Sequence, residues 1–331
     1  MPLAMWPLLR WRMRQPGKWV GSQAARFGTE RADFVARIVN TTRRLESLPS
    51  GESNVANEWE AALSAVGALE AYEAAHDKVE PNTAIEFLLF DARNASSIVN
   101  CIESGRINAR AVRTALTIET WQTINEGWQE MKKVQATYQA RGLGTEELVA
   151  FLDLAMKLAL DVDGSAYRTM LRNDAYWFSR LGLYVERADN TARILDVKYN
   201  ILLPESEHVG GSLDDFQWNA ILRAVSAVTS YHWIYRDGVK PWLIADLLIL
   251  RPEMPRSLLA CYGEIVRFLD AISSAYGRQG AAQRRARQIL GRLENATMKD
   301  VFSTGLHEFL TDFIEDNNSI GGAIAEQYLL D

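Results

Sequence analysis

Residues 186–194, Glu-Arg-Ala-Asp-Asn-Thr-Ala-Arg-Ile, decide the fold because the chain contains nearly the same stretch twice. The earlier copy, Glu-Arg-Ala-Asp-Phe-Val-Ala-Arg-Ile, occupies residues 30–38, which lie 156 positions before it. Because matches in one order are the signature of an internal repeat, we predict two diverged copies of a unit of about 155 residues. Three further segments recur in the same order, at offsets of 158 to 160: residues 59–72 match 218–231, 87–101 match 247–261, and 151–152 match 309–310.

Each copy is predicted to be helical. Between Asn94 and Leu116 the apolar residues follow the 3.6-residue period of a helix, and no proline interrupts them. Short polar side chains at the start of this segment can accept the free amides of a first turn. Leu213–Tyr235 and Pro255–Tyr276 have the same pattern, with Pro255 expected at a first helical position. No stretch alternates polar and apolar residues for long enough to indicate a strand.

The sequence therefore predicts an all-α protein, a helical bundle made of two tandem, pseudo-twofold-related copies of a five-to-six-helix unit. We expect one repeat at residues 21–165 and the other at residues 166–331, packed together as one domain. Residues 1–20 contain four basic residues, three tryptophans and no acidic residue, and Pro7 and Arg10 interrupt any secretory core. This leader is a membrane-surface peptide, a flexible segment or the result of a start codon placed too early; its prolines oppose a stable helix and so disfavour the first.

Composition places the chain among ordinary globular proteins. Of its 331 residues 48% are hydrophobic and 24% are charged, which excludes general disorder. The net charge of −6 makes attraction to nucleic acid or to an anionic membrane unexpected. No apolar run approaches the roughly 18 residues of a membrane span, so we expect a cytoplasmic protein. The two cysteines, Cys101 and Cys261, occupy aligned positions of the repeat and are predicted to be core residues rather than reactive thiols.

Few residues are suited to bind a metal. Two cysteines and four histidines are little material for a zinc site. Glu73-x-x-His76 has the ligand spacing of a di-iron bundle, but that site needs the motif twice, and the aligned positions hold His232 and Tyr235. The sequence also lacks the usual glycine-rich phosphate loops and the Gly-x-Ser-x-Gly nucleophile motif. We therefore predict neither a metal site nor a bound cofactor.

The second copy of the repeated stretch carries a rich polar face. A helix over Ser179–Leu203 places six polar residues opposite an apolar face: Glu186, Asp189, Asn190, Arg193, Asp196 and Asn200. Such a face can simply be solvated, with Asp189 and Arg193 paired one turn apart. The diverged first copy, however, keeps the charges at the aligned positions 30, 31, 33 and 37. We therefore favour an ion network between helices, or a ligand pocket, over a solvated face.

Two other groups of polar residues are candidates for binding. One helical line carries Glu103, Arg106, Arg110 and Arg113. These arginines could grip a phosphate or a carboxylate, or could pair with acidic helices across the fold, which is the commoner use of structural arginines. Near the C-terminus His307 and Asp312 lie little more than one helical turn apart, with Glu308 beside them. A single histidine gives only weak support to acid–base or metal chemistry.

The stretch from Arg172 to Pro204 is the most informative part of the chain. It contains Tyr-Trp-Phe-x-Arg at residues 176–180 and Glu-Arg-Ala-Asp-Asn-Thr-Ala-Arg-Ile-Leu-Asp-Val-Lys-Tyr at residues 186–199. With these motifs the chain resembles the bacterial alpha-E domain family. The first copy departs from the pattern, because Phe27-Gly28-Thr29 stands where members open on an aromatic–tryptophan helix. Weaker matches extend the resemblance from about Arg26 to the C-terminus, at residues 94–110, 116–121, 255–258 and 305–310.

The resemblance implies a helical protein that is commonly encoded beside, or fused to, a circularly permuted ATP-grasp ligase, often with a transglutaminase-like peptidase. It thereby suggests ATP-driven amide-bond formation on a peptide or amino-acid substrate, with ATP bound by the partner ligase. We hypothesise that the chain is a catalytic or substrate-handling subunit of such a system. The alternative is a non-enzymatic helical adaptor that binds and positions the ligase. The sequence leaves open whether the chain is itself an enzyme.

The first hypothesis assigns roles to residues of the polar faces. Glu186 would be a base or would orient the ligand, while Arg187, Asn190 and Arg193 would hold an anionic group. The whole predicted catalytic set is Glu186, Arg187, Asn190, Arg193, Asp196, His307, Glu308 and Asp312. The predicted ligand-binding residues are Arg172, Asn173, Lys198, Glu103, Arg106, Arg110 and Arg113. A closed pocket lined by Glu186, Asn190, Arg193 and the His307–Asp312 turn favours this hypothesis. A flat exposed face there, with a large apolar patch elsewhere, favours the adaptor.

Overall fold

The computed structural model describes residues 20–46, 52–200, 212–277 and 279–328. Within these ranges, residues 20–27, 52–57, 197–200 and 212–215 are described by their backbone only. The described residues form fifteen α-helices and one 3₁₀ helix and contain no strand, which confirms the predicted all-α class. The predicted leader at residues 1–20 lies outside the described part of the chain, apart from Val20, where the first helix begins.

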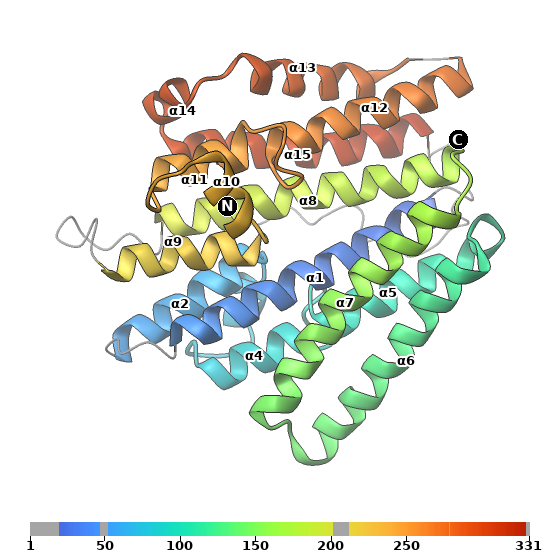
Figure 1. The fold of residues 1–331 in the computed structure, drawn as a ribbon. Helices are drawn as coiled ribbons and strands as arrows, with labels where there is room; N and C mark the ends of the chain where they lie inside the picture. Colours follow the sequence, from blue (N-terminus) through green and yellow to red (C-terminus); the bar gives the residue numbers. More distant parts are fainter. Residues whose placement is uncertain (1–19, 47–51, 201–211, 278, 329–331) are drawn as a thin grey trace.

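Two long helices of 27 residues each form the centre of the molecule, α1 (Val20–Glu46) and α8 (Asp174–Asn200). Figure 1 shows them side by side, and they pack against each other. The other elements are α2 (Glu52–Ala65), α3 (Leu69–Glu73), α4 (Pro81–Leu89), α5 (Ile98–Ala111), η1 (Arg113–Ala115), α6 (Ile118–Arg141), α7 (Thr145–Thr169), α9 (Ser212–Ala224), α10 (Val228–Ile234), α11 (Pro241–Ile249), α12 (Leu258–Tyr276), α13 (Ala281–Asn295), α14 (Met298–Thr304) and α15 (Leu306–Tyr328).

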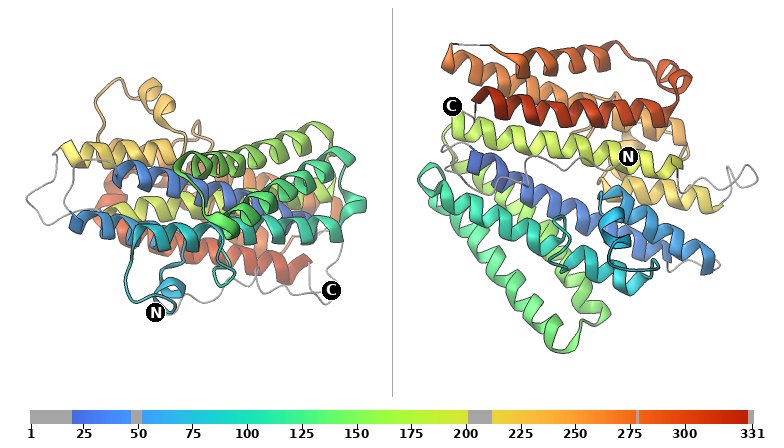
Figure 2. Two further views of the ribbon diagram at one scale, coloured as in Figure 1. Left: turned by 90° about the horizontal axis from the view of Figure 1, so that it is seen from below. Right: turned by 180° about the vertical axis from the view of Figure 1, so that it is seen from behind.

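Each central helix is covered by helices of its own part of the chain. Helix α1 packs against α5 and α7, whereas α8 packs against α12 and α15. The view from behind in Figure 2 shows the same order, with the orange and red helices beyond α8 and the cyan and green helices beyond α1. We call α1–α7 the first half and α8–α15 the second half. The two halves therefore meet mainly along α1 and α8, whose inward faces must be buried.

The number of helices differs from the predicted five or six per unit, because α1–α7 and α8–α15 comprise seven and eight α-helices. Several of the additional helices are short: α3 has 5 residues, and α10 and α14 have 7 each. A segment of one or two turns is too short to show a helical period in the sequence. The predicted boundary between residues 165 and 166 falls inside α7, and the chain turns at residues 170–173.

Two of the predicted helices differ in the structure: one is interrupted and the other begins later. Leu213–Tyr235 is not continuous, because Ser226 adopts a φ of 56° between α9 and α10 and so interrupts the helix. Pro255 is not the first helical residue, since Ser257 caps α12 by accepting a hydrogen bond from the amide of Ala260 at 3.0 Å. The earlier segment has an equivalent cap, where the Ser97 hydroxyl accepts from the amide of Asn100 at 3.4 Å.

Aligned positions of the repeat have similar surroundings in the two halves. Trp59 and Trp218 are both fully enclosed in the core. Cys101 and Cys261 are likewise buried, and each thiol donates to the carbonyl six residues earlier at 3.8 Å. Burial raises the pKa of both thiols to about 12, which agrees with the predicted core role. The superposition of one half on the other stays a prediction.

The core is one continuous cluster of buried side chains that includes residues of both halves. No helix in the described ranges has both the length and the apolar composition needed to cross a membrane.

Candidate functional site

The polar face of α8 is buried rather than solvated. Glu186 and Asp189 are 0% exposed, and Asn190 and Arg193 are also buried. Helix α1 covers this face, and Glu30, Arg31 and Asp33 on the facing side of α1 are buried as well. The structure therefore excludes the solvated-face alternative and shows a network of charges between the two central helices.

The centre of this network is a reciprocal exchange of partners. Arg31 donates to the Glu186 carboxylate at 3.1 Å. Arg187 donates to the Glu30 carboxylate at 2.9 Å through Nε and at 3.2 Å through Nη2. Each Glu-Arg dipeptide thus gives its arginine to the glutamate of the other. We call these four residues the crossed Glu-Arg pairs.

Further ion pairs surround the crossed Glu-Arg pairs. Arg37 binds Asp33 one turn away at 2.9 Å, and Arg193 binds Asp189 in the same way at 2.6 Å. Arg256, which precedes α12, donates to Glu30 and to Asp33 at 3.0 Å each. Because a buried charge is tolerated when it is paired and hydrogen-bonded, these contacts explain how so many charges can lie between α1 and α8.

The pKa shifts in the network follow from burial. Removal from water raises the pKa of Glu186 to about 7, an effect that Arg31 opposes and Asp189 reinforces. Among the described residues no partner is found for Glu186 Oε2, Asp189 Oδ1 or Asn190 Nδ2, although all three atoms are buried. Glu186, Asp189 and Asn190 are therefore enclosed by protein in this structure.

The predicted pocket lined jointly by Glu186, Asn190, Arg193 and the His307–Asp312 turn is not formed by the described residues. Glu186 and Asn190 are enclosed, whereas His307, Glu308 and Asp312 are exposed. One contact does join two members of the predicted catalytic set across α8 and α15, because His307 Nδ1 lies 2.6 Å from the Asp196 carboxylate. Asp196 stands one turn beyond Arg193, where α8 emerges from the core, so the acid–histidine pair lies at the surface.

The predicted ligand-binding residues around the start of α8 are mostly structural. Asn173 accepts a hydrogen bond from the amide of Tyr176 at 3.4 Å and so caps the helix. The Arg172 guanidinium lies 4.0 Å from the ring centre of Tyr176 and donates to the Tyr167 carbonyl at 2.6 Å. Lys198 falls in the part of α8 whose side chains lie outside the described set.

In the predicted arginine line of α5 and η1, Arg106 and Arg113 contact aromatic rings of α6 rather than acidic helices. The Arg106 guanidinium lies 3.9 Å from the ring centre of Trp128 and donates to Asn125 at 2.9 Å. Arg113 lies 5.5 Å from the ring centre of Trp121. Glu103 pairs with Lys132 at 3.4 Å, and Arg110 is exposed. The expected acidic partners are thus wrong for Arg106 and Arg113, because a guanidinium also stacks favourably on an aromatic face.

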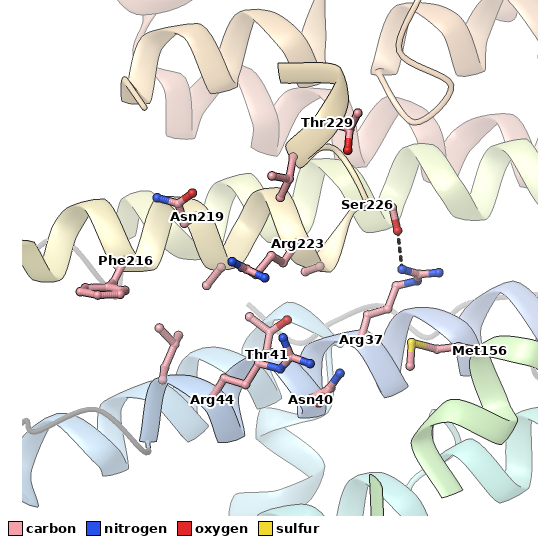
Figure 3. Close-up of a pocket in the computed structure, with 14 residues that line it drawn as sticks. Arg37, Asn40, Thr41, Arg44, Met156, Phe216, Asn219, Arg223, Ser226 and Thr229 are labelled. Atoms are coloured by element: carbon pink, nitrogen blue, oxygen red, sulfur yellow. Dashed lines mark hydrogen bonds between the residues drawn. The ribbon is translucent and has the colours of Figure 1, made fainter. Parts of the chain in front are cut away.

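A groove of about 900 Å³ lies between α1 and α9, and Met156 of α7 also lines it (Figure 3). Arg37 and Arg44 line it from α1, and Arg223 lines it from α9 (Figure 3). None of the described residues that line the groove carries a carboxylate. We call this cavity the arginine groove. Its remaining polar groups are uncharged and belong to Asn40, Thr41, Asn219, Ser226 and Thr229.

Ser226 fixes one end of the arginine groove. Its hydroxyl accepts a hydrogen bond from Arg37 at 2.6 Å, and the same arginine holds Asp33 through Nε (Figure 3). Ser226 also adopts a positive φ of 56°, which costs a residue with a side chain about 1 kcal/mol or more. Strained residues of this kind are common at binding sites, and here the strain aims a hydroxyl at an arginine.

Sequence reasoning missed the arginine groove. It selected the α8 side because Asn190 and Asp196 enrich the polar face there, yet the cavity lies beside α1. One signal was available: where the first copy has Ser64 and Gly67, the second has Arg223 and Ser226. A residue with a side chain at a turn that suits glycine is unfavourable, so its presence there points to a function such as binding.

No group of three or more metal-binding side chains occurs among the described residues.

Comparison with known proteins identifies a family. The sequence model of the Alpha-E family, described as a predicted alpha-helical domain with a conserved ER motif, matches residues 25–329. No curated protein and no solved structure matches the chain. The chain contains the dipeptide Glu-Arg at two places, Glu30-Arg31 and Glu186-Arg187. Both places belong to the crossed Glu-Arg pairs, so in this structure a Glu-Arg motif joins the two central helices.

Proposed function

The chain belongs to the Alpha-E family, and on that premise we propose that it is a substrate-handling subunit of an ATP-grasp-linked amide-ligation system. It binds an anionic substrate, a small molecule or a peptide, in the arginine groove. The ATP-dependent step belongs to a partner ligase of the circularly permuted ATP-grasp type, and a transglutaminase-like protein is a further possible member of the system.

The arginine groove is the observation that carries this proposal. Arg223 projects into it from α9 (Figure 3) and has no ion-pair partner among the described residues. Arginine recognises carboxylates and phosphates through a planar set of donors. A volume of about 900 Å³ is suited to a small molecule or to the end of a peptide. Carboxylates and phosphates are also the groups that ATP-driven amide formation activates or transfers.

The buried charges have a different role in this proposal. Glu186 and Arg187 pair with Arg31 and Glu30, so in this proposal they hold α8 on α1 rather than contact the substrate. Arg37 connects the two regions, since it binds Asp33 beside the crossed Glu-Arg pairs and Ser226 in the groove. The network thereby positions one wall of the arginine groove.

A specific observation favours a second candidate, the helical adaptor. Trp233 of α10 is 82% exposed, and Trp242 of α11 is also exposed. Large exposed aromatic side chains are enriched where proteins bind partners. An adaptor would use these residues to hold the ligase and would need no ligand in the arginine groove.

We also propose that the two halves arose by duplication of one helical unit. Helices α1 and α8 have equal length, and each is followed by a helix that breaks at an aligned residue of positive φ, Gly67 at 66° and Ser226 at 56°. The exchange of partners in the crossed Glu-Arg pairs is what a twofold relation between the copies requires, because residue i then contacts j and j contacts i. Superposition of α1–α7 on α8–α15 tests this proposal.

The function is tested by purification from the native host, followed by mass spectrometry of the proteins and small molecules that remain bound. We expect an ATP-grasp ligase and a compound with a carboxylate or phosphate. Arg223→Ala should retain the ligase and the melting temperature but weaken the compound's binding about tenfold or more.

Matched variants separate the two candidates. Arg284→Ala removes an exposed arginine of α13 and should leave the bound compound in place. If Arg223→Ala keeps both the compound and ligase-dependent product formation, the substrate-handling function is wrong. Loss of the ligase from Trp233→Ala or Trp242→Ala, with no compound bound to the wild type, would support the adaptor instead.

A further inference from the structure

A narrow slot adjoins the arginine groove. It lies between α1, α2, α8 and α9 and has a volume of about 50 Å³. Thr41, Leu45 and Ala220 line both cavities, so the two cavities are adjacent. The slot lies where α2 of the first half and α9 of the second half approach α1 and α8.

One carboxylate lies in the otherwise mainly apolar wall of this slot. Glu58 of α2 is only 4% exposed, and Oε2 has no hydrogen-bond partner among the described residues. Ala61, Ala62 and Ala65 on the same helix leave the space in front of it, and Ile194 and Ile221 close the other walls. A carboxylate in such surroundings is unfavourable unless a cation or a donor pairs with it.

The neighbouring charge increases this need for a cation. Burial, reinforced by the Glu46 carboxylate near the end of α1, raises the pKa of Glu58 to about 7. Glu46 itself accepts a hydrogen bond from the Trp59 indole at 3.4 Å. Gln217 of α9, which the repeat aligns with Glu58, lines the same slot and brings no charge.

We propose that the Glu58 slot receives an ammonium group, so that the ligand of the arginine groove is a zwitterion: a free amino acid or the amino-terminal end of a short peptide. This inference rests on the proposed binding of an anionic substrate in the groove. The arginines hold the carboxylate of the ligand, and Glu58 holds its amine.

Size and chemistry favour an ammonium group over a larger or an uncharged one. About 10–15 Å³ of such a volume accommodates one water molecule, so about 50 Å³ admits an ammonium with a short methylene stem but no large side chain. An ammonium is compact and offers three donors. It also supplies the positive charge that the described residues around Glu58 do not provide.

The test compares ligands that differ only in the charge of the amine. The probes are the common amino acids and a set of dipeptides, each with and without acetylation of the amino nitrogen. Binding to the full-length protein is measured by titration calorimetry. For the best probe we expect the free amine to bind at least about 30-fold more tightly than its acetylated form, as a desolvated charge pair requires.

Two variants locate the effect. Glu58→Gln is isosteric and imitates the aligned Gln217, so it should fold; it should reduce the preference for the free amine to a few-fold. Arg223→Gln should weaken both forms of the probe equally. Melting curves of both variants confirm that they are folded.

The outcomes distinguish the slot from the groove. If the wild type binds both forms equally, or if Glu58→Gln keeps the full preference, the ammonium site is wrong, while dependence on Arg223 still supports the groove. If no probe binds, or if Arg223→Gln changes nothing, the proposed anionic-substrate function fails, and with it the inference about Glu58.

Discussion

The arginine groove and the face that the internal repeat aligns with it share a backbone pattern but differ in charge. On the groove side stand Arg223 and Ser226, where the other face has Ser64 and Gly67. An acid on the other face, Asp196, aligns with an asparagine of the groove, and Glu60 and Glu70 align with Asn219 and Thr229. One side of the molecule is thus suited to an anion, and the aligned side is not.

The two faces nevertheless keep the same inner contact. Arg37 reaches Ser226 at 2.6 Å on the groove side. On the aligned face a side-chain carbon at Gly67 would lie 3.9 Å from Arg193 Nη1, so the corresponding arginine occupies the corresponding place. The buried charges are therefore common to both halves, whereas the surface next to them has changed. This difference is consistent with the proposal that the network supports the fold and that a ligand binds where the two halves differ.

The largest expected effect concerns the crossed Glu-Arg pairs, to which both halves contribute. Arg31→Ala should lower the free energy of unfolding by about 3–5 kcal/mol, because it leaves Glu186 buried without its main cation. Arg187→Ala should cost less, about 1.5–3 kcal/mol, since Arg256 still donates to Glu30 at 3.0 Å. Urea denaturation measures both.

An exposed ion pair serves as the control for these variants. Lys157→Ala breaks the exposed pair with Asp161 and should leave stability nearly unchanged, because water screens such a pair. Equal and small losses for Arg31→Ala and Arg187→Ala would contradict a structural role for the crossed Glu-Arg pairs.

The next effect is a pH dependence from Glu58 beside the arginine groove. Its pKa is raised from 4.5 to about 7 in the folded protein. Well below pH 4.5 the group is protonated in both states. Between about pH 4.5 and 7 the unfolded chain loses the proton that the folded chain still retains, so the stability of the folded state falls over this range. Glu58→Gln should therefore stabilise by about 1–3 kcal/mol at pH 8 and hardly at all at pH 4. If melting curves show an equal gain in stability at both pH values, the titration of Glu58 is not the cause.

A smaller effect is expected where the faces differ in backbone strain. Gly67→Ala should cost about 1 kcal/mol, because the position has a φ of 66°. Ser226→Gly should relieve a similar strain and raise stability by up to about 1 kcal/mol, less the contribution of the hydrogen bond from Arg37.

Ser226→Ala separates the backbone strain from the hydrogen bond, since it keeps the strain but removes the hydroxyl that accepts from Arg37. The comparison of the faces would be weakened if Ser226→Gly proved more destabilising than Ser226→Ala in thermal unfolding.

The smallest effect is expected on the aligned face. His307→Ala should change stability by well under 1 kcal/mol, because His307 is 48% exposed and water screens its contact with Asp196. The variant should also leave ligand binding unchanged. Loss of the bound compound from purified His307→Ala protein would instead restore the predicted site at the end of α8.

Features that depend on local pattern were predicted correctly. The helical period predicted the all-α class, which the described residues confirm. The sequence also predicted buried charges, because both copies keep the charges of the repeated stretch. Its errors concern short helices and the break at Ser226. A short helix shows no period, and only the alignment with Gly67 could have indicated the positive φ of Ser226.

The sequence by itself determined that α1 and α8 are long amphipathic helices with acids and arginines on one face, because spacing along a helix fixes which side chains share a face. Only the tertiary structure decided which arginine meets which glutamate: Arg31 meets Glu186 and Arg187 meets Glu30, across more than 150 positions of the chain. The tertiary structure also decided where the cavity lies. Charges that are paired across α1 and α8 are removed from water and from ligands, whereas Arg223, at the edge of the same packing, still faces the groove.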